Sequence, residues 1–161
     1  MERPEVITVD GKQIAIDSVY AIYGAEDTYS RQENNHYVSI FTKQGSVKVY
    51  AERTEQETGE RVVIMSHNLK KMDIDNFAFV NGYLINIDNT RYVDVERDPS
   101  GTRRVHAVFD GGKRMAISEE VSLSGSKEAD EIIASYDAQK SAIISARPVA
   151  EETPAQAPKE Q

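Results

Sequence analysis

The sequence contains no cysteine, only three histidines and no apolar run long enough to cross a membrane. Without cysteine the chain forms no disulfide, no thiolate nucleophile and no cysteine-ligated zinc or iron–sulfur site. His36, His67 and His106 have none of the spacings typical of metal ligands, so we expect no metal and no other cofactor. The first residues, MERPEVITVDGK, lack the basic start and apolar stretch of a secretory signal. We therefore expect a cytoplasmic protein that does not contact membranes.

The sequence also lacks a constellation typical of catalysis. Ser66 and His67 are adjacent in sequence, which does not point their side chains at each other as a catalytic triad requires. The acidic residues are scattered, and the glycines form no phosphate-binding loop ahead of a helix. We therefore expect no catalytic residues and no enzymatic activity.

What the sequence does contain is a series of hairpin patterns, in which apolar and polar residues alternate on both sides of a glycine-containing turn. Four such stretches, given with their turns, are residues 6–23 (Asp10-Gly11), 36–52 (Gln44-Gly45), 77–95 (Asn81-Gly82) and 103–118 (Asp110-Gly111-Gly112). Asp-Gly and Asn-Gly are the dipeptides most typical of two-residue hairpin turns. The fold class predicted is therefore mainly β, with antiparallel sheets and hairpins, one short helix and a C-terminal helix.

The remaining segments are predicted as loops and helices. Residues 24–35 read as a polar loop, and RTEQETGE (53–60) as a charged loop or hairpin tip after which RVVIM resumes a strand. HNLKKM (67–72) is predicted to be the short helix, capped by Ser66 or Asn68. A C-terminal helix is predicted over 126–146, with Ser126 as its cap and an apolar face. The Pro-, Ala- and Glu-rich residues 147–161 are predicted to be disordered.

The two halves of the chain resemble each other. VDGKQIAIDSVYAIY, from Val9, is similar to VNGYLINIDNTRYVD, from Val80. Two explanations are consistent with this similarity: an internal duplication, or two hairpins that obey the same turn chemistry independently.

Charge is distributed unevenly along the chain. The formal net charge of -8 opposes binding to nucleic acid, which favours basic surfaces. Between residues 99 and 118, however, the only acid is Asp110, and this stretch holds Arg103, Arg104, Lys113 and Arg114. A chain of negative net charge can therefore still present a basic edge, although a mixed surface that keeps the protein soluble is an equally good interpretation.

The order of these elements resembles the LytTR family, the β-rich DNA-binding domains of bacterial response regulators. The family has a short leucine-containing helix, then a phenylalanine, a turn, an aromatic residue, two aliphatic residues and an asparagine. Here the matching residues are Leu69, Phe77, Asn81, Tyr83, Leu84, Ile85 and Asn86, and Phe109-Asp110-Gly111-Gly112 with Ala116-Ile117-Ser118 resembles the family's last hairpin. The resemblance divides the chain into an N-terminal extension (1–5), a LytTR-like β domain (6–137), a helix extension (138–146) and the tail (147–161).

The resemblance implies a transcriptional regulator that binds duplex DNA through its hairpin loops, with no receiver domain and with a homodimer on paired sites as an option. The residues that this implies for DNA contact are Lys43, Gln44, His67, Asn81, Lys113 and Arg114. Asn86 and Asp88 are expected to be structural, closing turns or satisfying backbone groups.

The sequence departs from the family where the family contacts DNA. Ala78 and Val80 replace a basic residue and a histidine, Gly82 replaces a serine, and Glu119 stands where an arginine is usual. An acid at such a position repels phosphate. The alternative is a protein-interaction module on the same fold, with no catalytic role, which docks a protein partner through the C-terminal helix.

Overall fold

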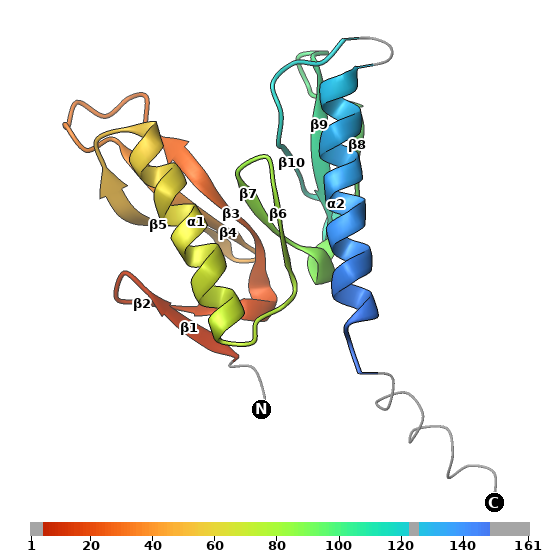
Figure 1. The fold of residues 1–161 in the computed structure, drawn as a ribbon. Coiled ribbons are helices and arrows are strands. Elements are labelled where there is room, and N and C mark those ends of the chain that lie inside the picture. Colours follow the sequence, from red (N-terminus) through yellow and green to blue (C-terminus); the bar gives the residue numbers. More distant parts are fainter. Residues whose placement is uncertain (1–4, 123–125, 149–161) are drawn as a thin grey trace, which may run out of the picture.

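The computed structural model describes residues 5–122 and 126–148, and it confirms a mainly β fold with antiparallel sheets and two helices (Figure 1). The expectations for residues 1–4 and 149–161 lie outside the described residues. The strands are β1 (Val6–Val9), β2 (Lys12–Ala15), β3 (Val19–Glu26), β4 (His36–Thr42), β5 (Gly45–Glu52), β6 (Phe77–Val80), β7 (Tyr83–Asn86), β8 (Thr90–Arg97), β9 (Arg103–Phe109) and β10 (Arg114–Ala116). The helices are α1 (Glu55–Lys71) and α2 (Lys127–Ser145), with short 3-10 turns η1 (Ile16–Ser18), η2 (Ile87–Asn89) and η3 (Asp110–Gly112).

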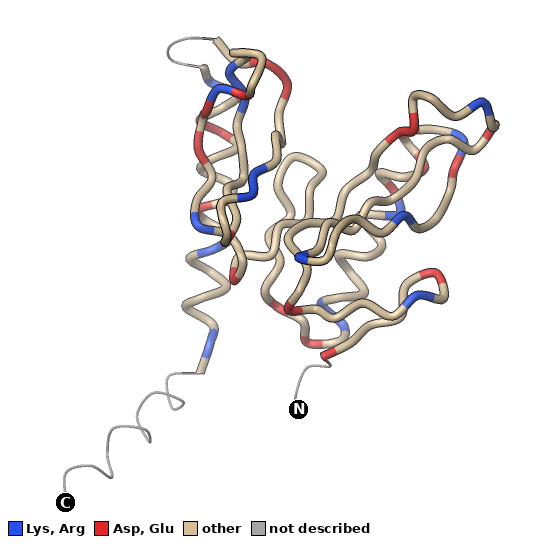
Figure 2. The backbone as a smooth tube through the Cα atoms, turned by 180° about the vertical axis from the view of Figure 1, so that it is seen from behind, with Lys and Arg blue, Asp and Glu red and all other residues tan. Residues whose placement is uncertain are grey.

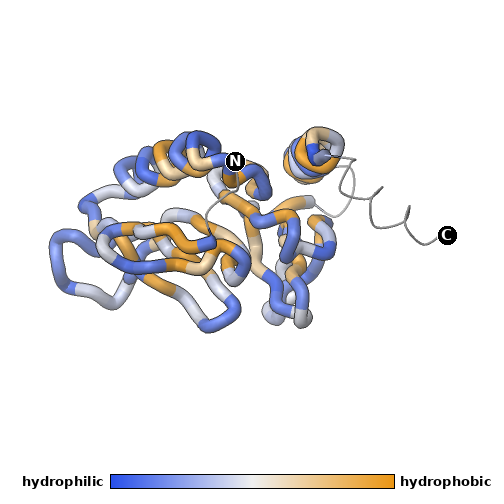
Figure 3. Tube along the Cα trace, turned by 90° about the horizontal axis from the view of Figure 1, so that it is seen from below, coloured by the Kyte–Doolittle hydropathy of each residue, from blue (hydrophilic) through white to orange (hydrophobic). Residues whose placement is uncertain are grey.

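The strands form three antiparallel sheets. β1 and β2 make a two-stranded sheet, β5-β4-β3-β7-β6 a five-stranded sheet, and β10-β9-β8 a three-stranded sheet. Helix α1 lies on the five-stranded sheet and α2 on the three-stranded sheet and β6, both on the same side of the molecule (Figure 3). All four predicted hairpins are present, three with their turns at the positions expected from the sequence. The turn between β4 and β5 lies at Lys43 and Gln44, one residue earlier than predicted, because Gly45 already pairs with Thr42.

The same order of elements occurs twice. Repeat 1 (residues 5–72) and repeat 2 (residues 76–146) each contain a hairpin, a 3-10 turn, three antiparallel strands and a helix. The first strands begin at Val6 and Phe77, and the 3-10 turns begin at Ile16 and Ile87, which are 71 residues apart in both cases. The structure therefore favours the internal duplication over two unrelated hairpins.

Irregular features recur at the same spacing, which makes chance similarity a poor explanation. The two hairpin turns place a non-glycine residue in the left-handed region, Asp10 (φ 51) in one and Asn81 (φ 50) in the other, followed in each by a glycine. Such turns match the twist of the flanking strands. The register shift after Val19 in β3 recurs after Thr90 in β8. The amide of Ile16 donates to the Glu5 carbonyl as that of Ile87 donates to the Asn76 carbonyl, both at 2.9 Å.

Helix α1 corrects the sequence-based prediction for residues 53–72. The loop or hairpin tip, the resumed strand and the short helix predicted there are one continuous helix from Glu55 to Lys71. Its cap is Thr54, not Ser66 or Asn68: the Thr54 hydroxyl accepts from the Glu57 amide, and the Glu57 carboxylate accepts from the Thr54 amide. The β-branched run at Val62 and Val63 favours a strand locally, but Val62, Met65 and Leu69 recur at helical spacing and pack into the core.

Helix α2 agrees with its prediction more closely. The Ser126 hydroxyl caps it by accepting from the Ala129 amide, and Ala129, Ile132 and Tyr136 are buried. The helix is continuous through residues 137 and 138, where the sequence-based boundary of the LytTR-like domain fell.

The two repeats are joined by the β6–β7 hairpin. This hairpin is the first part of repeat 2, and it lies between repeat 1 and the three-stranded sheet of repeat 2 (Figure 1). β7 pairs with β3 of repeat 1 at Ala21 and Ile22. Phe77 and Leu84 pack into the core of repeat 1, whereas Ala78, Val80 and Ile85 pack into the core of repeat 2. The hairpin is therefore apolar on both faces because both faces are covered.

A buried amide cluster fixes this junction. Asn86, 1 % exposed, donates to the Val19 carbonyl and accepts from the Asp88 amide and the Asn76 side chain. The Asn89 side chain donates to the carbonyls of Asp17 and Val19. Asn86 thus has the structural role that the sequence indicated, and it also ties repeat 2 to repeat 1.

His106 is a buried polar residue of the three-stranded sheet. It is 3 % exposed in β9, and its Nδ1 lies 3.0 Å from the carbonyl of Arg104. The side chain is enclosed because β9 is the central strand of the three-stranded sheet.

Candidate functional site

A cleft of about 740 Å³ lies between the two repeats, and we call it the inter-repeat cleft. The first turn of α1 and the end of β3 line it from repeat 1, and β10, the residues after it and the first turn of α2 line it from repeat 2. The tip of the β6–β7 hairpin, Asn81 and Gly82, lies between these walls. Both helices begin at this end of the molecule, beside the hairpin tip (Figure 1).

Two tyrosines form the aromatic part of the lining. The rings of Tyr23 from β3 and Tyr83 from β7 are tilted against each other with 5.4 Å between their centroids. Burial raises the pKa of the Tyr83 hydroxyl, Tyr23 and Glu119 raise it further, and Arg104 opposes them. The Tyr83 hydroxyl therefore stays neutral at physiological pH, and both tyrosines offer a hydroxyl for hydrogen bonding as well as ring surface.

Strand edges are accessible at the cleft. β3 pairs with β4 as far as Glu26, but with β7 only at Ala21 and Ile22. Beyond Tyr23, the edge of β3 that faces away from β4 therefore has no partner strand among the described residues. On the opposite wall β10 is the outer strand of its sheet, and the Asn81 side chain donates to the Ile117 carbonyl at 2.7 Å. Unpaired strand edges of this kind can hydrogen-bond an extended polypeptide.

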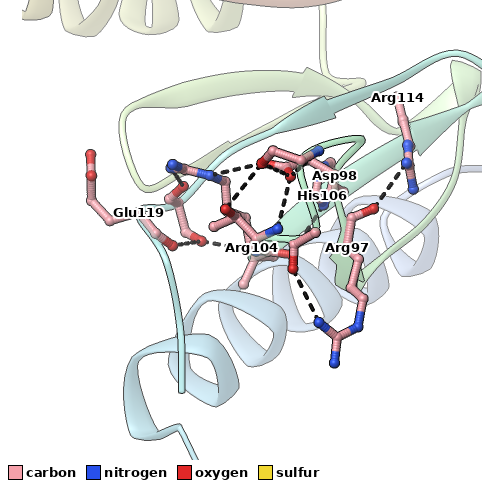
Figure 4. Close-up of polar contacts among 11 residues, drawn as sticks. Arg97, Asp98, Arg104, His106, Arg114 and Glu119 are labelled. Atoms are coloured by element: carbon pink, nitrogen blue, oxygen red, sulfur yellow. Dashed lines mark hydrogen bonds and ion pairs between the residues drawn. The ribbon is translucent and has the colours of Figure 1, made fainter. Parts of the chain in front are cut away.

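Arg104 is the one arginine or lysine among the residues that line the cleft, and its charge is already paired (Figure 4). Its Nε lies 3.4 Å from a carboxylate oxygen of Asp98, and its Nη1 donates to the Ser118 carbonyl at 3.2 Å. The Ser118 hydroxyl in turn accepts from the Val105 amide. Arg104 therefore fixes the segment after β10 against β9.

The residues predicted to contact DNA do not form one surface. Lys43 and Gln44 are exposed in the β4–β5 turn, and Lys113 is exposed after η3. These two turns are neighbours. The rings of Phe41 and Phe109, which precede the two turns, meet edge to face with 5.9 Å between their centroids, and the Tyr20 hydroxyl donates to the Asp110 carbonyl.

The other three predicted contacts lie elsewhere. His67 is exposed in the C-terminal half of α1, not at a helix start. Asn81 is at the hairpin tip in the inter-repeat cleft. Arg114 is engaged within the protein, since one amino group contacts Glu96 at 2.7 Å and the other donates to the Arg97 carbonyl (Figure 4). The Tyr92 hydroxyl and Arg114 together hold the pKa of the Glu96 carboxyl below its ordinary value.

Two of the four basic residues at 103–114 are therefore paired with acids within the protein. Arg104 pairs with Asp98 and Arg114 with Glu96, both from the β8 side of the sheet. Seen from behind, the described chain shows basic and acidic residues interspersed over both halves, with no half covered by basic residues alone (Figure 2). The mixed-surface interpretation of the charge pattern fits this arrangement.

Among the described residues no group of three or more histidines, aspartates or glutamates could hold a metal ion. Neither α1 nor α2 has the length and apolar character that a membrane-spanning helix needs.

Sequence reasoning missed the cleft because its lining comes from six separate segments of the chain. Tyr23 and Tyr83 occupy no equivalent positions in the two repeats, and each was read only as part of a strand. The recurring Gly-containing hairpin was the one available signal, since a duplicated unit generates an interface between its copies.

Comparison with protein-family models, with curated proteins and with solved structures gives no match to this chain. Membership of the LytTR family therefore stays a prediction from the sequence.

Proposed function

We propose that this protein is a non-catalytic protein-interaction module in which two copies of one structural unit form a cleft for a segment of a partner protein. The observation that carries the proposal is the inter-repeat cleft itself, with a tyrosine pair and accessible strand edges in its walls. Aromatic side chains supply contact area with a polar end, and strand edges supply main-chain hydrogen bonds, which together are the means by which proteins hold extended segments.

The chemistry of the cleft fits a polypeptide better than a small metabolite. Its walls are polar and open to solvent, whereas metabolite sites are usually enclosed and mostly apolar with a few convergent polar groups. The site proposed here differs from the C-terminal helix favoured by the sequence: only the first turn of α2 contributes, through Glu128.

Selection of binding peptides on the purified full chain tests this proposal. A phage-displayed library of random peptides is screened in parallel on the wild type and on Tyr23→Ala, a half-buried position at the cleft. We expect sequences enriched on the wild type to lose at least tenfold in affinity on the variant. Arg53→Ala, exposed and outside the cleft, should retain them. Enrichment that both variants retain would place binding elsewhere, and a failure to enrich any sequence would count against an interaction module.

DNA binding is the second candidate function, and one observation favours it: the turns that carry Lys43, Gln44 and Lys113 lie side by side. Exposed lysines on neighbouring turns can contact successive phosphates. Binding to pooled random duplex DNA at low and moderate salt tests it, beside the double variant Lys43→Glu/Lys113→Glu. Binding that falls steeply with salt and is lost in the double variant would support this candidate. No binding at micromolar protein in low salt would remove it.

A further inference from the structure

We infer that the inter-repeat cleft selects a partner segment that carries lysine or arginine, an inference that rests on the proposed protein-interaction function. Three carboxylates line the cleft: Glu55 from the start of α1, Glu119 from the segment after β10, and Glu128 from the first turn of α2. All three are exposed, and none has an ion-pair or side-chain hydrogen-bond partner among the described residues. They come from both repeats and from three separate elements, so the negative charge surrounds the cleft rather than marking one wall.

The single basic side chain in the lining does not cancel this charge. Arg104 is already balanced by Asp98, which lies outside the lining residues. Because Arg104 already pairs with Asp98, no basic side chain of the lining neutralises the carboxylates of Glu55, Glu119 and Glu128. An incoming lysine or arginine would pair with them, whereas an acidic segment would be repelled.

The tyrosine pair adds a second, independent preference for a cation. The Tyr23 and Tyr83 rings are half-buried and line the cleft, and the face of an aromatic ring attracts an ammonium or guanidinium group. Burial is the main cause of the raised pKa of Tyr83, and Glu119 and, less strongly, Glu55 add to it, so both carboxylates act on the space beside the rings. Elsewhere in this protein the same chemistry is used internally, because Arg61 lies over the Tyr50 ring at 4.5 Å and Lys48 over the Tyr37 ring at 4.7 Å.

Glu55 and Glu128 could be present for helix stability rather than for binding in the cleft. Glu119 distinguishes these two roles. Glu55 and Glu128 lie in first helical turns, where an acid stabilises the helix dipole whatever the cleft does. Glu119 belongs to no helix, and only its backbone carbonyl is engaged, by the Ser118 hydroxyl. The effect of Glu119 on binding therefore reports on the cleft alone.

The experiment is a titration of the ¹⁵N-labelled full chain with three pools of random decapeptides, followed by amide chemical shifts. The two central positions are fixed as Lys or Arg in one pool, as Gln in the second and as Glu in the third. Glycine amides supply the readout, because Gly24, Gly59 and Gly82 line the cleft, whereas Gly11 and Gly45 lie in distant hairpin turns. The basic pool is expected to shift the three cleft glycines and to leave the distant two unchanged.

Matched variants complete the test. Glu119→Lys should weaken binding of the basic pool by about tenfold, the effect of roughly 1.4 kcal/mol. Glu131→Lys makes the same charge change at an exposed site of α2 outside the cleft and should have little effect. The spectrum of each variant also shows whether it is folded.

The outcomes separate the two proposals. Cleft glycines that shift equally with the Gln or Glu pool would overturn the basic partner and leave the interaction module standing. Shifts confined to residues outside the cleft would overturn the proposed preference for a basic segment in the cleft, and would also show that the protein-interaction module binds its partner at another site. No shift with any pool would contradict both proposals.

Discussion

At the residue scale, Gly24 sets how closely α1 approaches the five-stranded sheet. A Cβ atom at Gly24 would lie 2.8 Å from Oγ1 of Thr58, which real side chains do not tolerate. Thr58 has little freedom to move, because it is 1 % exposed and its hydroxyl donates to the Glu55 carbonyl at 2.8 Å. The absence of a side chain at residue 24 thus shapes both the helix packing and one wall of the inter-repeat cleft.

We predict that Gly24→Ala lowers the free energy of unfolding by about 1–3 kcal/mol, the usual cost of overpacking. Urea unfolding followed by circular dichroism measures the change. Gly59→Ala is the matched control, since Gly59 lies within α1 and a Cβ atom there meets nothing within 4 Å. Alanine favours helix over glycine, so this control should stabilise the protein by up to about 1 kcal/mol. Equal effects of the two substitutions would contradict the packing argument.

Tyr136 is the residue whose ionisation matters for the fold at high pH. It is 1 % exposed, and burial raises the pKa of its hydroxyl to about 12. The hydroxyl has no hydrogen-bond partner among the described residues, and the nearby Thr90 hydroxyl donates to the Asn86 carbonyl instead. Below about pH 10 the folded and unfolded chains both keep this proton. Between about pH 10 and 12 the unfolded chain loses it first, so the free energy of unfolding falls as pH rises.

We predict that Tyr136→Phe reduces this alkaline loss of stability and costs little at pH 7, because no hydrogen bond is broken. Melting temperatures between pH 7 and 11 provide the measurement. Tyr29→Phe, at a tyrosine that is 94 % exposed, should leave the profile unchanged. A Tyr136→Phe profile that parallels the wild type would show that another group governs the alkaline range.

At the element scale, α1 shows how tertiary contacts and capping override a local preference. Its sequence includes Val62 and Val63, which favour strands, and Gly59, which disfavours helices. Against these stand the capping box of Thr54 and Glu57 and the burial of Val62, Met65 and Leu69. A T-x-x-E pattern at 54–57 was readable in the sequence as a helix start, and it is the signal that would have corrected the prediction.

We predict that Thr54→Ala lowers the free energy of unfolding by about 1 kcal/mol, because the Glu57 amide loses its acceptor. Thr54→Ser keeps the hydroxyl and should restore most of the loss. Thermal unfolding of both variants beside Thr28→Ala, which changes an exposed threonine outside any helix or strand, measures the effect. If the serine variant were as unstable as the alanine variant, the cap would not be the cause.

At the scale of the whole molecule, the buried amide side chains that fix the junction between the repeats all belong to repeat 2. Positions 71 residues before Asn86 and Asn89 are Ala15 and Ser18, so the buried amide cluster has no copy in repeat 1. When every group of such a buried cluster is hydrogen-bonded, the cluster favours one relative placement of the two repeats. Removal of one partner leaves another buried group without a hydrogen bond and lowers stability.

We predict that Asn86→Ala lowers the free energy of unfolding by about 2–4 kcal/mol, since three hydrogen bonds are lost and their buried partners remain. The protein should still unfold in one transition, because the β6–β7 hairpin belongs to both cores. Denaturation followed by circular dichroism and by tyrosine fluorescence tests both statements. Asn34→Ala, at an exposed loop asparagine, is the control. Two separated transitions in the wild type would contradict a shared core.

The outer face of the first hairpin is less apolar than the corresponding face of the β6–β7 hairpin, and the open edge of β8 is charged. On the hairpin face where repeat 2 has Phe77, Phe79 and Leu84, repeat 1 has Val6, Thr8 and Gln13, which are exposed. At the other end, the open edge of β8 carries exposed charges at Arg91 and Asp94. Charges on an open edge oppose pairing with another chain. Among the described residues, these side chains oppose outward repetition of the inter-repeat contact.

We predict that the double variant Thr8→Phe/Gln13→Leu self-associates, because it restores the apolar face that β6–β7 uses between repeats. Light scattering at increasing protein concentration measures the mass, with the wild type expected to remain at the 18.0 kDa of one chain. Thr8→Ser/Gln13→Asn is the matched control. If the variant stays monomeric, the charges on the open edge of β8 are sufficient by themselves to prevent pairing with another chain.

The sequence by itself determined the local structure of this protein. Asp10-Gly11 and Asn81-Gly82 fixed two hairpins, and Ser126 fixed the start of α2, because turn and cap chemistry act over a few residues. It also determined that no cysteine chemistry is available. Only the tertiary structure decided that helix α1 continues through the β-branched residues Val62 and Val63 to Lys71, and that His106 is buried.

The tertiary structure likewise decided where a partner could bind. Tyr23, Tyr83 and Glu119 lie far apart in the sequence and meet only because the β6–β7 hairpin inserts between the repeats. The pairing of Arg104 with Asp98 and of Arg114 with Glu96 is equally invisible in sequence order, since the antiparallel strands β8, β9 and β10 bring those charges together. Local chemistry specifies each unit, whereas the contact between units, which depends on both at once, creates the candidate site.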